Sequence, residues 1–461
     1  MRLVKHGSPP FLVLLLVQAI LLTNVLVHDP SIGYDGGEHL RYIEALSKLR
    51  LPSRDDTGEF FSPPLPYAVP ALLRAAGLSI RWAAKAGQLI NLACSLGLCL
   101  CMLKICDLVR PKCARLRFWS LALLAIVPAY YKSFSMVRGE PLLSLLIADA
   151  VFLTLRAYRT NPCRARDFVS IGVLLGLAVL ARQWAFFVFP AIAFFALFLP
   201  APNWKARLLN LKPLFLSFSI AAAIGSWFYV SLEMRYGRLT SFNRLPAVRL
   251  SIANQPREFY VGLGLGALFS DPIRPAFPNE FIPIFYSEFW GDYECYFVVY
   301  GKDRRNGQFY SGSDLEQVLK EHGSATWLET NRFRIAPFLG YAQTVALLPS
   351  VLFTMGFAFG IASLFREQSN QPATALLALV TLASFLGYFA FLILYPNLGK
   401  GDTIKATYML QVFPLLAVLG ADLLVSVRDR SSVSYHLLAA LLAVSAALNA
   451  PLLFTRYVGP P

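Results

Sequence analysis

Long apolar stretches alternate with short polar segments along almost the whole chain, from residue 10 to residue 455. A helix of roughly 20 apolar residues can cross the hydrocarbon core of a bilayer, which is about 30 Å thick. The pattern therefore predicts an all-α polytopic membrane protein with about eleven transmembrane helices. They are expected at residues 10–28, 81–106, 116–131, 141–157, 168–181, 184–200, 212–232, 336–364, 373–395, 404–426 and 433–454.

Composition agrees with this prediction, and the distribution of charge indicates an orientation. The 461 residues are 56% hydrophobic and only 15% charged, with a mean hydropathy of +0.53, which is unusual for a soluble domain. The net charge of +15 comes from Lys and Arg in short links between apolar runs, so it indicates membrane topology rather than nucleic-acid binding. The basic links contain Arg2 and Lys5; Arg110, Lys112, Arg115 and Arg117; Arg156, Arg159, Arg164 and Arg166; Lys205, Arg207 and Lys212; Arg366; and Arg428 and Arg430.

These links all fall on one side of the predicted spans, which the positive-inside rule makes cytoplasmic. We therefore expect a multi-pass protein of a plasma or inner membrane, or of the endoplasmic reticulum in a eukaryote, with a cytoplasmic N-terminus. Residues 10–28 are expected to be a retained span rather than a signal peptide. The residues from Val27 to Pro30 would make a poor small-residue cleavage site.

Two loops on the opposite side hold most of the acidic residues. Seven lie between Asp29 and Glu59 and twelve between Glu233 and Glu329, out of 27 in the chain. We expect an N-terminal catalytic module at residues 1–232 that includes an extracytoplasmic loop at 29–80. An extracytoplasmic loop domain at 233–335 and a C-terminal transmembrane module at 336–461 would follow. The candidate chemistry is expected in the loops.

The first loop contains the densest group of polar side chains, close to the end of the first span. The group consists of Tyr34, Asp35, Gly36, Gly37, Glu38 and His39. Glycines allow a ligand to approach the backbone closely, and carboxylates beside a membrane are suited to general-base work. The alternative is a turn followed by an amphipathic helix through Leu40, Ile43 and Leu46, with Asp35 as its cap.

Further charged residues lie in other links on the same side. Arg138 and Glu140 precede the fourth span together with Lys132, Arg182 follows the fifth, and Lys400, Lys405 and Tyr408 lie around the start of the tenth. Such cations could hold a phosphate, although snorkelling and ordinary loop charges explain them equally well. Trp290 and Asp292, in the second loop, resemble a sugar-binding surface, and a packed loop core is the alternative.

The order of these features resembles the polyprenol-phosphate-sugar-dependent glycosyltransferases of the C-type superfold (GT-C), near the protein O-mannosyltransferases and lipid A aminoarabinose transferases. That family shows a Tyr-Asp-Glu-x-x-His stretch after the first span, a run ending in Pro-Pro-Leu-x-Tyr, and an Arg-containing link before the fourth span. The matching residues are Tyr34, Asp35 and His39; Pro63, Pro64, Leu65 and Tyr67; Arg138 and Glu140; Trp227, Tyr229, Tyr236 and Gly237; and Lys405, Tyr408 and Pro414. The resemblance covers most of the chain apart from the second loop.

The chain departs from the family pattern at one position. Where the family commonly has Glu directly after the first Asp, this chain has Gly36, and Glu38 follows two residues later. The departure favours Asp35 as the catalytic residue and weakens the case for a metal-binding acidic pair.

The resemblance implies transfer of a sugar from a polyprenyl-phosphate donor to a hydroxyl of a glycan, lipid or protein acceptor, with inversion. Asp35 would be the general base, with Glu38 as a second catalytic candidate. The substrate would be bound by His39, Tyr34, Glu140, Trp290 and Asp292, and the donor phosphate by Arg138, Arg182, Lys400, Lys405 and Tyr408. The implied partners are the lipid-linked donor, an acceptor glycan, lipid or protein, and membrane lipids, without nucleic acid; no metal site is predicted, and a role for a divalent cation is left open.

Two other functional classes remain open at this point. A transporter or lipid flippase would use Asp149, an acidic residue inside the fourth span, because intramembrane acids commonly mark transport pathways. A noncatalytic membrane scaffold is the third class, and it would not require Asp35.

Overall fold

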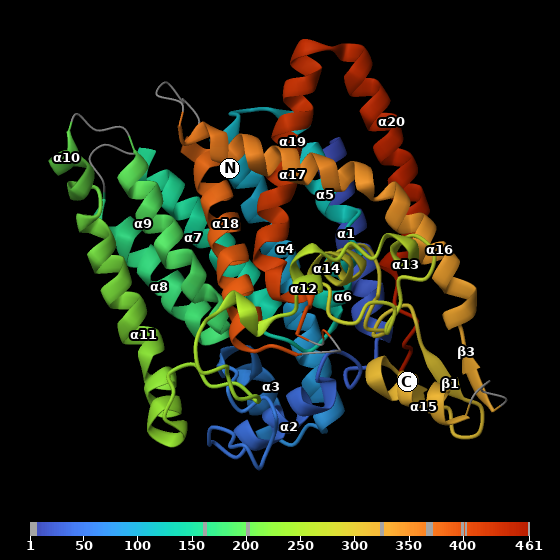
Figure 1. Ribbon diagram of the computed structural model, residues 1–461. Helices are drawn as coiled ribbons and strands as arrows, with labels where there is room; N and C mark the ends of the chain where they lie inside the picture. Colours follow the sequence, from blue (N-terminus) through green and yellow to red (C-terminus); the bar gives the residue numbers. More distant parts are fainter. Residues whose placement is uncertain are drawn as a thin grey trace.

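The structure is a computed structural model that describes residues 7–159, 164–199, 203–322, 327–365, 372–397, 401 and 403–459. Among these residues, eight helices are long and apolar enough to cross a membrane. They comprise α1 (Pro9–Val27), α4 (Ile80–Val109), α7 (Glu140–Arg159), α11 (Lys212–Tyr236), α16 and α17 (Arg332–Val345 and Leu347–Ser363), α18 (Pro372–Leu394), η3 and α19 (Ala406–Val412 and Phe413–Arg430), and α20 and η4 (Ser432–Asn449 and Ala450–Leu453). They form the bundle in Figure 1 and confirm the all-α polytopic class.

The other three expected spans are short or broken helices, so the count of eleven is not confirmed. The expected span at 116–131 is divided into α5 (Ala114–Ala125) and α6 (Pro128–Ser135). Val127 between them is extended, because a residue before proline disfavours the helical conformation. The remaining two are α8 (Ala165–Ala181), and η1 (Gln183–Phe187) with α9 (Val188–Phe198); the short α10 (Trp204–Leu209) follows.

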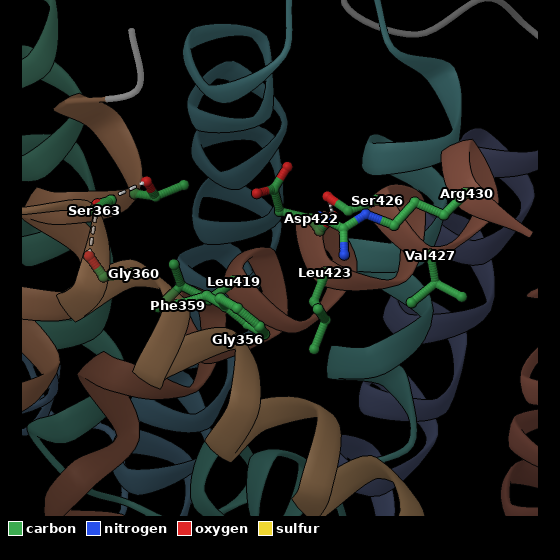
Figure 2. Close-up of a pocket in the computed structure, with 11 residues that line it drawn as sticks. Gly356, Phe359, Gly360, Ser363, Leu419, Asp422, Leu423, Ser426, Val427 and Arg430 are labelled. Atoms are coloured by element: carbon green, nitrogen blue, oxygen red, sulfur yellow. Dashed lines mark hydrogen bonds between the residues drawn. The ribbon is translucent and has the colours of Figure 1, made fainter. Parts of the chain in front are cut away.

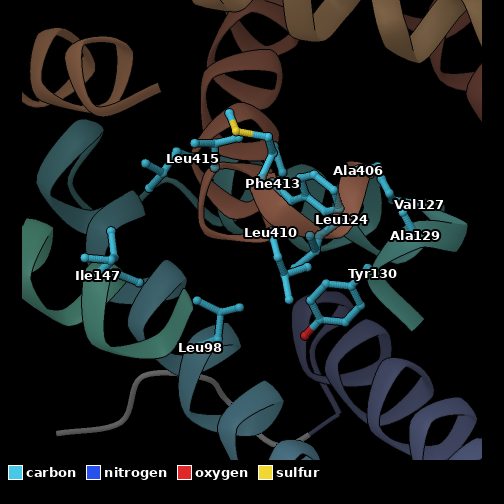
Figure 3. Packing of buried hydrophobic residues seen from close by; sticks show 14 of the residues in the cluster. Leu98, Leu124, Val127, Ala129, Tyr130, Ile147, Ala406, Leu410, Phe413 and Leu415 are labelled. Carbon is cyan, nitrogen blue, oxygen red and sulfur yellow. The ribbon is translucent and has the colours of Figure 1, made fainter. Parts of the chain in front are cut away.

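The hydrophobic core lies where the central helices meet the start of α19. Leu98 of α4, Leu124 of α5 and Ile147 of α7 are buried there with Leu410 and Phe413 (Figure 3). Side chains that are apolar on every face of these helices satisfy both the protein interior and a surrounding bilayer. This packed core therefore fixes the positions of the helices from which the long connecting segments extend.

The first loop lies at the lower end of the bundle in Figure 1, away from the turn between α19 and α20, and the second loop extends from the middle of the picture down to the same end. The first loop contains α2 (Gly36–Leu46) and α3 (Leu65–Ala75), which pack against each other and against α4. Helix α3 buries Tyr67 and Ala71 and exposes Val69 and Leu72, as expected for a helix along a membrane surface.

The second loop begins with η2 (Ile252–Asn254), α12 (Arg257–Val261), α13 (Leu265–Leu268) and α14 (Phe281–Trp290). It continues with α15 (Gly312–His322) and a three-stranded antiparallel sheet in the order β2 (Phe309–Tyr310), β1 (Gly301–Asp303), β3 (Leu328–Thr330).

Helix α14 is the part of this loop that enters the bundle. It contacts α6, η3 and α16 and buries Phe281, Ile284 and Phe289, so it brings loop residues next to the first loop. The division of the chain into three modules remains a prediction.

The segment after η4 joins the end of α1 to the second loop. His28 Nδ1 lies 2.7 Å from Thr455 Oγ1, and the amide of Asp29 donates to the Tyr457 carbonyl oxygen at 3.1 Å. The Tyr457 hydroxyl donates to the carbonyl oxygen of Cys295 at 2.7 Å. These contacts fix the short stretch of chain that leads from α1 into Asp35.

Candidate active site

Asp35 stands at the start of α2, and its carboxylate faces a cation from the far end of the chain. Its Oδ2 lies 3.1 Å from Nζ of Lys405, the residue before η3. The Asp35 side chain is 39% exposed and that of Lys405 is 12% exposed. Solvent therefore reaches the carboxylate of this pair more than its ammonium group.

The amphipathic helix expected as the alternative is present, but Asp35 does not cap it. Helix α2 buries Tyr42, Ile43 and Ala45. Asp35 occupies the N-cap position in the left-handed conformation, with φ of 55°, and its side chain makes no capping hydrogen bond. The carboxylate is therefore available to Lys405. A positive φ at a residue other than glycine is uncommon and is found repeatedly at functional sites.

Gly36 is dictated by close packing at the helix start. A Cβ atom on Gly36 would lie 2.3 Å from the carbonyl oxygen of Ser31, whereas a Cβ atom on Gly37 would meet nothing within 4 Å. Ser31 is held by Asp29, whose Oδ1 accepts a hydrogen bond from the Ser31 hydroxyl at 2.7 Å. No side chain fits after Asp35 with this backbone.

Tyr34 anchors the residue before Asp35 in a buried polar pocket. Its hydroxyl donates to Glu288 of α14, and Lys132 of α6 donates to the same carboxylate at 2.7 Å. The carbonyl oxygen of Tyr34 accepts a hydrogen bond from Nη1 of Arg138 at 3.2 Å. The cations of Lys132, Arg138 and Lys405 lie 5.5, 5.1 and 5.1 Å from the Tyr34 ring centroid, where cation–π attraction is favourable.

A buried network of charges lies behind Tyr34. Arg138 donates from Nε and Nη2 to the two carboxylate oxygens of Glu140, each at 3.1 Å, and Nε of Arg182 lies 3.1 Å from Glu140 Oε1. Nη1 of Arg182 donates to Glu59 at 3.3 Å. All four side chains are buried. Two arginines thus face two carboxylates, and the network is internally neutral.

The approach of these segments depends on Gly139. A Cβ atom at this position would lie 2.6 Å from the carbonyl oxygen of Ala181. The glycine therefore allows the first turn of α7 to lie directly against the end of α8, where Arg182 begins.

His39 completes the buried side of the site. Its Nδ1 lies 2.9 Å from the Tyr67 hydroxyl and 4.0 Å from Glu59 Oε2, while its buried Nε2 has no hydrogen-bond partner among the described residues. Burial lowers the pKa of His39 to about 4 despite the nearby Glu59 carboxylate. The imidazole is therefore neutral at physiological pH.

The electrostatics of Asp35 and Lys405 are reciprocal. The positive charge of Lys405 lowers the pKa of Asp35 well below its ordinary value, although burial acts in the opposite direction. Burial opposes the charge of Lys405, but Asp35 and Tyr408 outweigh it and raise the pKa of the ammonium group. Both groups are thus charged at neutral pH. Tyr408 is buried, with the Lys405 and Arg138 cations 5.8 and 5.7 Å from its ring centroid.

A buried carboxyl group that the sequence analysis did not select, Glu294, lies on the loop after α14. Its Oε2 accepts from Nη1 of Arg274 at 2.6 Å, and its Oε1 is buried with no hydrogen-bond partner among the described residues. Burial raises its pKa to about 7, and Lys405 is close enough to act against this rise. The site therefore contains two carboxyl groups with opposite shifts in pKa, a combination common at catalytic centres.

Other residues selected from the sequence lie at structural positions. Glu38 accepts from the Gly58 amide at 2.7 Å and the Thr57 hydroxyl at 2.9 Å. Trp290 donates to Ser350 at 2.7 Å and stacks on Phe353.

Asp292 accepts backbone hydrogen bonds from Tyr296, Phe297, Val298 and Val299 at 2.7 to 3.0 Å. Like Glu38 and Trp290, it is engaged within the protein itself. Lys400 lies outside the described residues. Asp149 lies in α7, which packs against α4.

Metal ligands do not gather around Asp35. No group of three or more His, Cys, Asp or Glu side chains that could hold a metal ion occurs in the described part of the chain. The charged neighbour nearest to Asp35 is a lysine, and Gly36 leaves no adjacent acid. These residues do not fit a divalent-cation site.

A separate cavity lies at the opposite end of the bundle from this site. It has a volume of about 230 Å³, and Gly356, Ser363, Leu419, Ser426 and Arg430 are among the residues around it (Figure 2). None of the residues selected from the sequence lines it.

Comparison with known proteins gives the fold. No protein-family model matches the chain, and no curated protein matches its sequence. The structure of ArnT from Cupriavidus metallidurans bound to undecaprenyl phosphate matches with a TM-score of 0.51 at 14% identity, over 96% of this chain and 64% of that chain. The Archaeoglobus fulgidus oligosaccharyltransferase matches in its apo form with a TM-score of 0.52 at 16% identity, over 98% and 56% of the two chains.

The fold is the GT-C superfold. The resemblance expected from the order of sequence features is thus confirmed for the architecture. The same archaeal oligosaccharyltransferase in complex with Zn and sulfate matches with a TM-score of 0.51 at 14% identity, over 97% of this chain and 53% of that chain. The chain spans less than two thirds of the length of each of these proteins.

We expect Gly36→Ala to destabilise the protein through a packing clash, whereas Gly37→Ala should change only the helix propensity of the residue. The methyl group at position 36 would collide with Ser31 and cost roughly 1–3 kcal/mol, whereas alanine at position 37 should change stability by less than about 1 kcal/mol. Thermal unfolding of the two purified variants measures the difference. Equal stability would contradict the packing described for Gly36.

The raised pKa of Glu294 predicts a specific pH dependence of stability. The folded protein holds this proton up to about pH 7, while the unfolded chain releases it near pH 4.5, so the free energy of unfolding should fall as pH rises between these values. Glu294→Gln should remove this fall in the free energy of unfolding, which is of order 1–3 kcal/mol. Denaturant unfolding in detergent micelles from pH 4.5 to 8 measures it, with Glu321→Gln on the exposed face of α15 as the control.

Proposed function

We propose that this chain is an integral membrane glycosyltransferase that moves a sugar from a polyprenyl-phosphate donor to an acceptor hydroxyl, with Asp35 as the general base. The observation that carries the proposal is the Asp35–Lys405 pair, an accessible carboxylate and ammonium 3.1 Å apart. A reaction that removes a proton from one substrate and releases a phosphate from another can use one group of each kind, a base and a cation. The shared fold with ArnT bound to undecaprenyl phosphate supports a lipid-phosphate donor.

The proposed step forms one bond and breaks one bond at both the acceptor oxygen and the anomeric carbon. Asp35 accepts the proton of the acceptor hydroxyl as the hydroxyl oxygen forms a bond to the anomeric carbon. The bond from that carbon to the phosphate oxygen breaks, and its electron pair leaves with the polyprenyl phosphate. Attack opposite the leaving group inverts the anomeric carbon.

Lys405 has two roles in this proposal. It stabilises the charge that develops on the departing phosphate, which is commonly the largest electrostatic contribution in such a step. It also controls Asp35, because the low pKa set by the ion pair makes the carboxylate a weak base. A donor phosphate that draws the ammonium group toward itself would raise the pKa of Asp35 and strengthen the base once the donor is bound.

The buried residues serve as supports in this proposal. Arg138 and Arg182 are held by Glu140 and Glu59, so this neutral network positions the backbone of Tyr34 beside Asp35. Tyr34 and Tyr408 shape the wall around Lys405. The identities of the sugar and the acceptor are set by parts of the chain beyond these residues, and the active site is expected on the extracytoplasmic side.

Asp35→Asn tests the proposed base directly. Loss of the proton acceptor should lower sugar transfer by about 10²–10⁴-fold, whereas Asp55→Asn, at an exposed position in the same loop, should leave it unchanged. Transfer of radiolabelled sugar from a polyprenyl-phosphate donor by protein in lipid measures this. Full activity of Asp35→Asn would remove the mechanism and favour a noncatalytic role.

Lys405→Met should affect both the leaving group and the pH profile. The loss of phosphate stabilisation should lower kcat by roughly 10²–10³-fold. The acidic limb of kcat/KM should also move to higher pH, because the pKa of Asp35 is no longer held down by Lys405. A profile from pH 4 to 8, with exposed Lys48→Met as the control, measures both effects; an unshifted limb would contradict the coupling.

The described residues predict that turnover does not require an exchangeable divalent cation, since no group of three or more His, Cys, Asp or Glu side chains that could hold one occurs among them. Titration with a chelator during turnover should therefore leave the rate unchanged. A rate that falls and is restored by added Mg²⁺, Mn²⁺ or Zn²⁺ would show that ligands assemble only when substrate is present.

A further inference from the structure

A pocket lined by arginines lies beside the first loop, separate from the Asp35–Lys405 pair. It has a volume of about 390 Å³, within the usual range for ligand pockets. Its described lining residues are Arg54, Gly58, Phe60, Arg238, Ser241, Phe242, Asn243, Arg244 and Leu245. Three of them are cations and none is acidic, so the pocket favours an anion.

The floor of the pocket is aromatic and holds one arginine in place. The guanidinium of Arg54 lies 5.2 Å from the ring centroid of Phe60 and 4.8 Å from that of Tyr236. A guanidinium stacked on rings in this way keeps its edge free for planar donation to phosphate oxygens. The pocket thus offers oriented donors as well as positive charge.

Large exposed apolar side chains lie in the pocket lining or close to it in the sequence. Leu245 is 81% exposed and Val248 is 99% exposed, and Leu239, next to Arg238, is also exposed. Exposed leucines beside arginines at the end of a transmembrane bundle fit the boundary between acyl chains and headgroups. This arrangement favours an amphiphile over a small soluble anion.

One wall of the pocket also belongs to the loop that supports the candidate active site. Gly58 lines the pocket, and its amide donates to Glu38 of α2 at 2.7 Å. The next residue, Glu59, pairs with Arg182 in the buried network. An occupant would therefore lie against the segment that holds α2 and Glu59 in position.

We propose that this pocket binds the anionic phosphate headgroup of a membrane lipid in the leaflet at the active-site end of the bundle. The phosphate would be held by Arg54, Arg238 and Arg244, and the acyl chains would lie against these exposed apolar residues. The proposal concerns binding alone and does not rest on the proposed transferase function.

The test uses the full chain purified in a neutral detergent, with hydrogen exchange of the backbone amides of residues 57–60 and 241–245 as the readout. Phosphatidylglycerol added to the micelles should slow this exchange, whereas phosphatidylcholine at the same mole fraction should not. Arg54→Ala with Arg238→Ala should raise the half-saturating lipid fraction about 30-fold (about 2 kcal/mol), because each arginine near an anionic headgroup contributes about 1 kcal/mol.

The matched control removes two other exposed arginines. Arg304→Ala with Arg305→Ala removes the same charge from the second loop, where Arg305 lies 5.8 Å from the Trp327 ring centroid, and it should leave protection unchanged. Arg238→Glu, a single exposed substitution, should abolish protection and provides the same test if the double variant does not fold.

Three outcomes would overturn the proposal. They are equal protection by phosphatidylcholine, undiminished protection in Arg238→Glu or the folded double variant, and equal protection by inorganic phosphate in the absence of added lipid. The last outcome would identify a soluble anion as the ligand in place of a lipid.

Discussion

A single buried carboxylate, Glu140, holds two buried guanidinium groups at the end of the helical bundle. Removing one partner from such a buried arrangement commonly costs about 3–5 kcal/mol, because the remaining charge is left without compensation. Arg138, Glu140 and Arg182 come from the link before α7, the first turn of α7 and the end of α8, so their pairing fixes these three segments together. Arg138 also holds the Tyr34 carbonyl oxygen, and the position of the catalytic candidate therefore depends on the same network.

Because the buried network is neutral, the accessible site needs only one carboxylate and one cation, Asp35 and Lys405. Since Arg138 and Arg182 are already compensated by carboxylates, a bound phosphate need not compete for them. Lys405 is compensated by Asp35 alone among the carboxylates within 4 Å in the described structure, and this partner is itself exposed. Lys405 can therefore move from Asp35 to a bound phosphate, and this move releases Asp35 to act as a base. The buried charges keep their geometry during the change.

The sequence predicted the class of fold, and it selected candidate residues that lie close together because they stand beside the ends of apolar stretches on one side. Residues of this kind that gather in the structure are Tyr34, Asp35, His39, Arg138, Glu140, Arg182, Lys405 and Tyr408. The helix count was not predictable from hydropathy, because a proline break such as that before Pro128 leaves an apolar stretch unchanged in composition. The position of α14 was missed for a similar reason: ten residues are too few to span a bilayer, yet enough to enter the bundle.

The partners of the buried cations could not be read from the sequence, since ion pairing between distant segments leaves no local pattern. Glu288 lies only four residues before Asp292, and both belong to a segment of aromatic and acidic residues that looks uniform in sequence. Glu288 accepts from Tyr34 and Lys132, whereas Asp292 accepts four backbone amides from its own loop and lies 3.6 Å from Lys132. Which carboxylate turns toward the first loop depends on where α14 ends. The short-range motif around Asp35 was therefore a better guide to the site than the charge composition of the second loop, because its chemistry is set by backbone conformation within a few residues.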